Sequence, residues 1–120
     1  MMKLKKIYSK HIPFKGYKAI TILFWMIVRK EYMLTLSWWV DVHENIHLAQ
    51  EIELAIVLFY ILYVLEFAIK LLITFNWDRA YRSVSFEQEA YNNQFNKDYL
   101  ENRRHYAWIK YVFTLKPREL

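Results

Sequence analysis

The stretch His43-Glu44-Asn45-Ile46-His47, written H-E-x-x-H, determines how the rest of the chain is interpreted. On a helix, residues four positions apart lie on one face, so His43 and His47 present two imidazoles to one point. Glu44 lies one step round the same turn. Imidazoles are common zinc ligands, and a neighbouring carboxylate can accept a proton from a metal-activated water. The motif is typical of zinc hydrolases when a third ligand is present. The alternative is a surface helix that carries two histidines by chance.

The composition indicates a single domain with an unusually apolar character. The chain has 120 residues, of which 56% are hydrophobic and 19% aromatic, more than an ordinary soluble domain carries. Charged residues still make up 24%, so the chain is not simply a membrane bundle. We therefore expect one domain over 1–120, with either a heavily buried core or an apolar surface that rests on lipid or on a partner.

The formal charge of +5 is concentrated near the two ends of the chain. Basic ends beside aromatic-rich apolar segments suit an anionic membrane surface. Nucleic acid is the other partner that a basic patch suggests, but no nucleic-acid motif is found, so none is expected. The absence of cysteine excludes disulfides and thiolate metal ligands. The basic residues concerned are Lys3, Lys5, Lys6, Lys10, Lys15, Lys18, Arg103, Arg104, Lys110, Lys116 and Arg118.

The first third of the chain is predicted to hold a short sheet. Residues 1–18 are interpreted as a basic arm with a turn at Pro13 and Gly16; no apolar run follows the lysines, so no cleavable signal peptide is expected. Residues 19–28 favour a buried strand, with a short interfacial helix as the alternative. Residues 33–36 are a second candidate strand. Ser37 then suits the N-cap of a helix that begins at Trp38.

Residues 54–75 form the most hydrophobic segment and contain two charges, Glu66 and Lys70. Three interpretations stay open: a helix that spans a membrane, one that lies in the membrane interface, and one buried in a bundle. An unbroken helix over 38–75 would be about 57 Å long, so we expect either a bend or an apolar tail that leaves the core. Membrane contact is expected, and the localisation is predicted as membrane-associated or cytoplasmic.

The third metal ligand is sought among acids and histidines on other elements, since catalytic zinc usually has three protein ligands. After a polar break at 76–79, Ser85 is a plausible N-cap of a helix that runs to about Tyr99. On this helix Glu87 shares the expected inward face with Tyr91 and Phe95, whereas Glu89 shares a polar face with asparagines and is expected to meet water. A buried acid needs a partner, so Glu87 is predicted as the ligand. Glu89 remains the alternative ligand on this helix, and His11 and His105 are the other candidates. Residues 105–113 are predicted to form a short helix that packs back.

The combination of motifs resembles the gluzincin group of zincin metallopeptidases. In that group a second helix supplies a glutamate ligand, as Glu87-Gln88-Glu89-Ala90-Tyr91 would here, about forty residues after the H-E-x-x-H motif. The longer patterns H-E-x-x-H-x-x-Q and F-E-x-E-A-Y, found in minimal gluzincins and small bacterial proteins, include Gln50, Phe86 and Ala90. The likeness covers 43–50 and 86–91 closely. It implies an α+β, mostly α, minimal zincin-like fold: a short N-terminal sheet or hairpin, a long active-site helix and a glutamate helix.

The resemblance also implies the chemistry. His43, His47 and Glu87 would bind Zn²⁺, and Glu44 would be the general base of a membrane-associated peptidase that acts on a peptide or protein. Tyr91 stands where the group usually has an aspartate that orients a zinc histidine, so this support lacks a negative charge. Oxyanion stabilisation is expected from Tyr91, Tyr81 or Arg82, and a strand from 19–28 could pair with extended substrate.

Two other functions remain open. The Glu44-x-x-His47 spacing also occurs in carboxylate-bridged di-metal helical bundles, but these need a second such motif, and Glu101 to His105 is a four-residue step. The other is a membrane-associated structural or partner protein that keeps the zincin shape without activity. The sequence specifies neither a substrate nor an oligomeric state.

Overall fold

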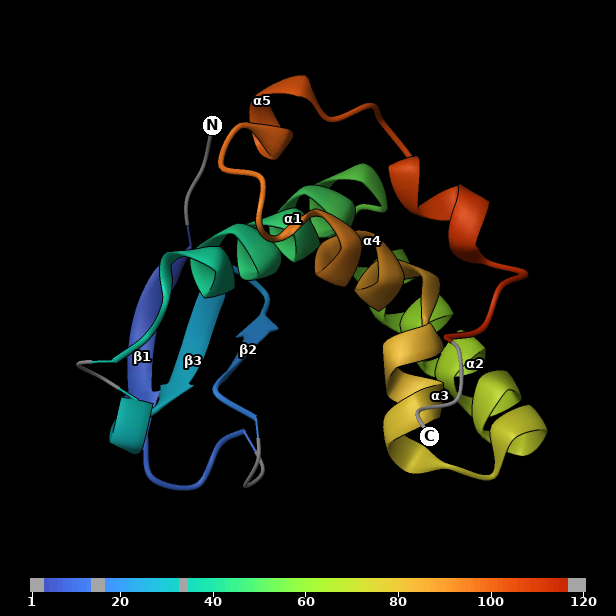
Figure 1. Ribbon diagram of the computed structural model, residues 1–120, viewed down its shortest axis with the longest axis horizontal. Coiled ribbons are helices and arrows are strands. Elements are labelled where there is room, and N and C mark those ends of the chain that lie inside the picture. Colours follow the sequence, from blue (N-terminus) through green and yellow to red (C-terminus); the bar gives the residue numbers. More distant parts are fainter. Residues whose placement is uncertain (1–3, 14–16, 33–34, 117–120) are drawn as a thin grey trace.

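The computed structural model describes residues 4–13, 17–32 and 35–116, and it has the predicted α+β, mostly helical architecture. A small sheet lies at one end, a long helix runs from it across the molecule, and most of the remaining helices gather at the other end (Figure 1). The strands are β1 (Lys5–Ser9), β2 (Ala19–Ile22) and β3 (Trp25–Arg29). The helices are η1 (Lys30–Tyr32), α1 (Trp38–Glu53), α2 (Val57–Thr74), α3 (Trp77–Ser83), α4 (Ser85–Asn93), α5 (Tyr99–Asn102) and η2 (Ala107–Tyr111).

The sheet has the order β1-β3-β2, with β1 parallel and β2 antiparallel to β3. The interpretation of 1–18 as an arm is wrong, because Lys5–Ser9 is a strand. Its side chains are mostly exposed, so the lysines stay in water while the backbone pairs, and no apolar alternation marks the strand. The single strand over 19–28 is also wrong: it is a β2–β3 hairpin. Leu23 adopts the turn with φ 54°, without the glycine or asparagine that usually signals it.

The entry into α1 agrees only in part with expectation. Met33 and Leu34 lie outside the described residues, and Thr35 and Leu36 are not in a strand. Ser37 is the N-cap in an extended conformation, although its side chain makes no capping hydrogen bond. Gly16 of the expected turn also lies outside the described part of the chain.

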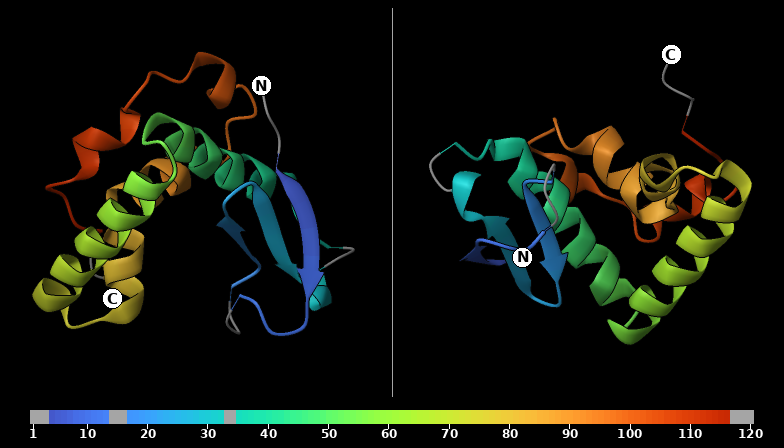
Figure 2. Two further views of the ribbon diagram at one scale, coloured as in Figure 1. Left: turned by 180° about the vertical axis from the view of Figure 1, so that it is seen from behind. Right: turned by 90° about the horizontal axis from the view of Figure 1, so that it is seen from below.

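The bend expected after the H-E-x-x-H helix is confirmed. Helix α1 ends at Glu53, and Ala55 (φ 53°) and Ile56 (φ 61°) turn the chain before α2 begins. The two helices diverge from this corner, as Figure 2 shows from behind. Beside the corner lies an apolar cluster that joins α2, α4 and η2, built from Leu54, Phe59, Val84, Phe86 and Trp108.

The segment after α2 is more helical than predicted. The polar break at 76–79 is wrong, since Asn76 caps α3 by accepting the Arg79 N–H at 3.0 Å. Ser85 is the first residue of α4 rather than its cap, because the Glu66 carboxylate takes the capping role: it accepts from the Ser85 N–H and hydroxyl, each at 2.6 Å. Helix α4 ends at Asn93, short of Tyr99. Within 105–113 the short helix is η2, which buries Trp108.

Helix α2 is not the buried helix that was one of the three interpretations. Only Phe59 and Lys70 among its 18 residues are buried. Its two charges turn inward, where Lys70 Nζ contacts Glu66 Oε2 at 2.6 Å and donates to the Ser83 carbonyl. In the described part of the chain, α2 is the one helix long and apolar enough to cross a membrane.

Candidate metal centre

Helices α1 and α4 bring together the three residues predicted as metal ligands. Glu87 Oε1 lies 3.0 Å from His43 Nε2 and 3.1 Å from His47 Nε2, and all three side chains are buried. Their ligand atoms lie within 4.8 Å of one another. The four-residue step on α1 places both imidazoles on the face that meets α4.

The donor set fits zinc. Two imidazole nitrogens and one carboxylate oxygen are ligands found at catalytic zinc sites, and ligand atoms about 2.0–2.1 Å from a tetrahedral zinc lie about 3.3 Å apart. The observed 3.0 and 3.1 Å separations are close to this spacing. In the described residues no second group of three ligating side chains occurs, which disfavours a di-metal bundle.

Glutamine amides hold the second nitrogen of each histidine. His43 Nδ1 lies 2.8 Å from Gln94 Oε1, and His47 Nδ1 lies 2.8 Å from Gln50 Oε1. Because an amide oxygen only accepts, each Nδ1 carries a proton, and each Nε2 is left to face Glu87. Gln94 was missed from the sequence. Gln94 lies seven residues, or two helical turns, after Glu87 on the same face of α4, and this spacing could have identified it from the sequence.

The pKa values of His47 and Glu87 are shifted strongly in opposite directions. Burial alone would lower the pKa of His47, but the Glu87 carboxylate outweighs it and raises this pKa to about 10. Burial alone would raise the pKa of Glu87, but the two imidazoles hold it well below its usual range. The metal-free centre therefore contains a carboxylate paired with an imidazolium, and a dication would take the place of that proton.

Glu44 lies beside the ligands with its carboxylate oriented by the sheet. The Thr21 hydroxyl of β2 donates to Glu44 Oε2, a contact that the sequence did not suggest. Burial raises the pKa of Glu44, although the imidazoles of His43 and His47 oppose this. A buried carboxylate with a raised pKa is suited to accept and return a proton near neutral pH.

A tyrosine from α2 orients Glu87, the predicted third ligand. The Tyr63 hydroxyl donates to Glu87 Oε2 at 2.7 Å, which leaves Oε1 turned toward the two histidines. The sequence analysis did not single out Tyr63. It lies four residues after Phe59 on the inward side of α2, and this period is the available signal.

Tyr91 does not contact the second nitrogen of a zinc-site histidine, as the aspartate usual at its position would. Its ring packs edge-on against His43, with centroids 4.4 Å apart, while Gln94 contacts the imidazole nitrogen. The Tyr91 hydroxyl lies 3.5 Å from that of Tyr81, and the Arg82 guanidinium lies 5.0 Å from the Tyr91 ring centroid. The three groups expected near the oxyanion therefore gather on one side of the centre.

Two cavities flank the centre and share Ala19, Glu44 and Tyr81 in their linings. One, of about 200 Å³, is lined by His43, Glu44 and the Tyr81, Arg82 and Tyr91 group. The other, of about 240 Å³, is lined by the residues of β2 together with Phe59, Tyr60, Tyr63, Tyr81, Glu44, His47 and Glu87. β2 is an edge strand of the sheet; all four of its residues line the larger cavity, and Ala19 also lines the smaller one.

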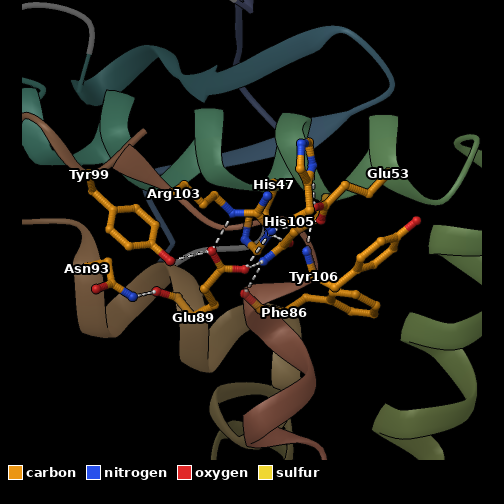
Figure 3. A network of polar contacts seen from close by, with 10 residues as sticks. His47, Glu53, Phe86, Glu89, Asn93, Tyr99, Arg103, His105 and Tyr106 are labelled. Carbon is orange, nitrogen blue, oxygen red and sulfur yellow. Dashed lines mark hydrogen bonds and ion pairs between the residues drawn. The ribbon is translucent and has the colours of Figure 1, made fainter. Parts of the chain in front are cut away.

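The prediction that Glu89 meets water is wrong. Glu89 is 0% exposed and binds Arg103, Gln50 and Tyr99 (Figure 3). Phe95, expected on the inward face, is 63% exposed beyond the end of α4. The other ligand candidates do not join the centre: His11 is exposed, and His105 contacts Glu53 at 3.2 Å.

No protein-family model, curated protein or solved structure matches this chain, so the geometry of the centre carries the functional argument alone.

Proposed function

We propose that the protein is a zinc-dependent metallopeptidase with His43, His47 and Glu87 as ligands and Glu44 as general base. The observation that carries this proposal is the convergence of both Nε2 atoms on Glu87 Oε1, with each Nδ1 occupied by an amide oxygen. When bound, zinc would supply Lewis acidity and lower the pKa of a coordinated water.

The side chains around the centre have distinct tasks in this proposal. Glu44, oriented by Thr21, accepts a proton from the attacking water and returns it to the leaving amine. Tyr81, Arg82 and Tyr91 line the same cavity as His43 and Glu44, and they can stabilise negative charge on the substrate carbonyl oxygen.

The edge strand β2 supports peptide as the substrate class. Extended peptides bind by adding a strand to a free sheet edge, where backbone hydrogen bonds supply affinity irrespective of sequence. Ala19–Ile22 is an edge strand, and its residues line the cavity that also contains Glu44, His47 and Glu87. A peptide paired there would run past the general base, as hydrolysis of its backbone requires.

The test combines metal content with peptidase activity. Purified wild type is expected to contain one zinc per chain, and His47→Ala to contain none. Glu44→Gln should keep zinc but lose nearly all hydrolysis of a mixed peptide library, because only the proton acceptor is removed. Glu101→Gln, an exposed acid on α5, is the matched control and should behave as wild type.

Each alternative result would contradict the proposal in its own way. Full activity in Glu44→Gln would refute the assigned base. Two irons per chain would favour a di-metal bundle, and a metal-free wild type without activity would favour a structural or partner protein.

We also propose that the enzyme works on a membrane surface, with α2 lying in the interface. The outward side of α2 carries no charge, because Glu66 and Lys70 turn inward. That inward side packs on α3, so a spanning helix would leave the polar pair and its partners in lipid. The exposed apolar residues are Val57, Leu58, Ile61, Val64, Leu65, Ile69, Leu72 and Ile73.

Flotation with phosphatidylcholine–phosphatidylglycerol vesicles tests the membrane contact. Wild type should float with the vesicles, and Leu65→Glu combined with Ile69→Glu should remain at the bottom while keeping its zinc. Glu101→Gln serves again as the control. Equal flotation of the double variant and wild type would contradict contact through α2.

A further inference from the structure

Behind His47, away from the cavities, lies a buried acid that the proposed chemistry does not use. The Glu89 carboxylate receives four donated hydrogen bonds: from Gln50 Nε2 at 2.9 Å, from the Tyr99 hydroxyl at 2.7 Å, and from two nitrogens of Arg103 (Figure 3). It is the only acid on α4 besides the ligand Glu87. A fully buried carboxylate two positions from a metal ligand calls for a reason beyond packing.

We propose that Glu89 is a positioning residue for the metal centre. It fixes the orientation of the Gln50 amide, and through that amide it directs Nε2 of His47 toward the metal. The inference rests on the proposed zinc function, and it assigns a role to a residue that touches neither the metal nor the substrate.

The chain of contacts determines the direction of each hydrogen bond. An amide has one accepting oxygen and one donating NH₂ group, so a flipped Gln50 would turn the NH₂ group toward His47. The flip is opposed on the far side, where Gln50 Nε2 meets two acceptors, Glu89 Oε1 at 2.9 Å and the Phe86 carbonyl at 3.0 Å. With the NH₂ group held there, Gln50 Oε1 must face His47 Nδ1, at 2.8 Å.

This orientation determines which nitrogen of His47 is the ligand. An acceptor at Nδ1 keeps the proton on that nitrogen, so the proton that a metal would replace is the one on Nε2, which points at Glu87. A donor at Nδ1 would favour the opposite tautomer and put the proton on Nε2. The carboxylate at position 89 is suited to prevent this, because an ionised carboxylate only accepts.

Arg103 keeps Glu89 in place and also provides a matched control. The guanidinium lies between two acids, with Nε 2.5 Å from Glu89 Oε2 and one terminal nitrogen 2.8 Å from Glu53 Oε1. Both acid side chains are shielded from water, but only Glu89 contacts Gln50. Glu53 instead receives the Tyr106 N–H and contacts His105. A purely structural role of the ion pairs would make the two acids equivalent, whereas positioning makes them different.

The experiment compares zinc affinity by chelator competition in Glu89→Met, Glu53→Met, Gln50→Leu and the double variant Gln50→Leu/Glu89→Met. Loss of support behind a metal-binding histidine typically costs about 10–100-fold in affinity, and this loss is expected for Glu89→Met and for Gln50→Leu. Because Glu89 acts through Gln50, the double variant should lose no more than Gln50→Leu alone. Glu53→Met should bind zinc as tightly as wild type.

A second measurement needs no metal. In the ¹H–¹⁵N spectrum of the metal-free protein, both side-chain amide protons of Gln50 should be protected from exchange, since both have acceptors. One of them should lose protection in Glu89→Met and neither in Glu53→Met. Gln50→Leu leaves the Arg103 ion pairs intact, so its affinity remains informative even if Glu89→Met does not fold.

Three results would overturn the positioning role: wild-type affinity in Gln50→Leu, additive losses in the double variant, or equal losses in Glu53→Met and Glu89→Met. A wild type that binds no zinc would refute the proposed function instead. The Gln50 amide spectrum would then still decide whether Glu89 orients that side chain.

Discussion

Raising the pH of the metal-free protein is expected to destabilise it, because His47 holds a proton in the folded state that it loses in the unfolded state. Glu87 raises the pKa of His47 from 6.5 to about 10. Below pH 6.5 both states bind the proton, and the ion pair contributes fully to stability. As the pH rises from 6.5 toward 10, the unfolded state releases the proton first. The free energy of unfolding therefore falls across this window, by at most about 1.4 kcal/mol per pH unit for one proton.

The assay is urea unfolding at several pH values within this window, with a chelator present to keep the centre free of metal. Glu87→Gln removes the charge that raises the pKa of His47, so its stability should vary less with pH than that of wild type. Glu101→Gln, at an exposed position, should keep the wild-type slope. A flat wild-type profile, or an unchanged slope in Glu87→Gln, would refute the assignment of a His47–Glu87 ion pair.

Three further predictions concern groups around the centre. Tyr63→Phe should weaken zinc binding about tenfold by chelator competition, since Glu87 loses its 2.7 Å hydroxyl donor; an unchanged affinity would contradict this. Lys70→Ala should lower the free energy of unfolding by about 3–5 kcal/mol, because the Glu66 carboxylate, whose side chain is only 13% exposed, loses its cation, whereas Lys6→Ala, in an exposed ion pair, should cost less than about 1 kcal/mol. Similar losses of unfolding free energy in Lys70→Ala and Lys6→Ala, measured by urea unfolding, would refute this difference. Gln94→Glu should tighten zinc binding, since a carboxylate would face the first histidine; weaker binding would contradict it.

The helical periodicity was sufficient to predict which side chains meet at the centre. The i, i+4 step of His43 and His47, and the position of Glu87 beside the buried Phe86 and Ala90, are local properties of two helices. The bend after α1 was one of the two outcomes expected because a straight helix over 38–75 would be about 57 Å long, and the molecule's greatest extent of 37 Å leaves no room for that length.

The same periodicity failed where distant chain segments decide burial. Glu89 does lie on a different face from Glu87, but α5 and the chain after it cover that face and bring Arg103 to the carboxylate. A helical wheel of α4 contains no information about residues ten to fourteen positions further along. The strand at Lys5–Ser9 was missed for a different reason. Its backbone pairs with β3, but its side chains remain in water, so the sequence there shows no alternation of apolar and polar residues.

The use of amides behind both histidines has a consequence for the reactivity of the centre. A carboxylate at Nδ1 adds negative charge, which strengthens metal binding but reduces the electrophilicity of the metal. In the proposed zinc centre Gln50 and Gln94 would orient the imidazoles without adding charge, and Glu87 would be the only anionic ligand among the described residues. The charge of Glu89 is balanced by Arg103, one contact further out. If the proposed zinc centre is correct, this arrangement would preserve the geometric support of a carboxylate while leaving more positive charge for a bound substrate carbonyl, at the expense of metal affinity.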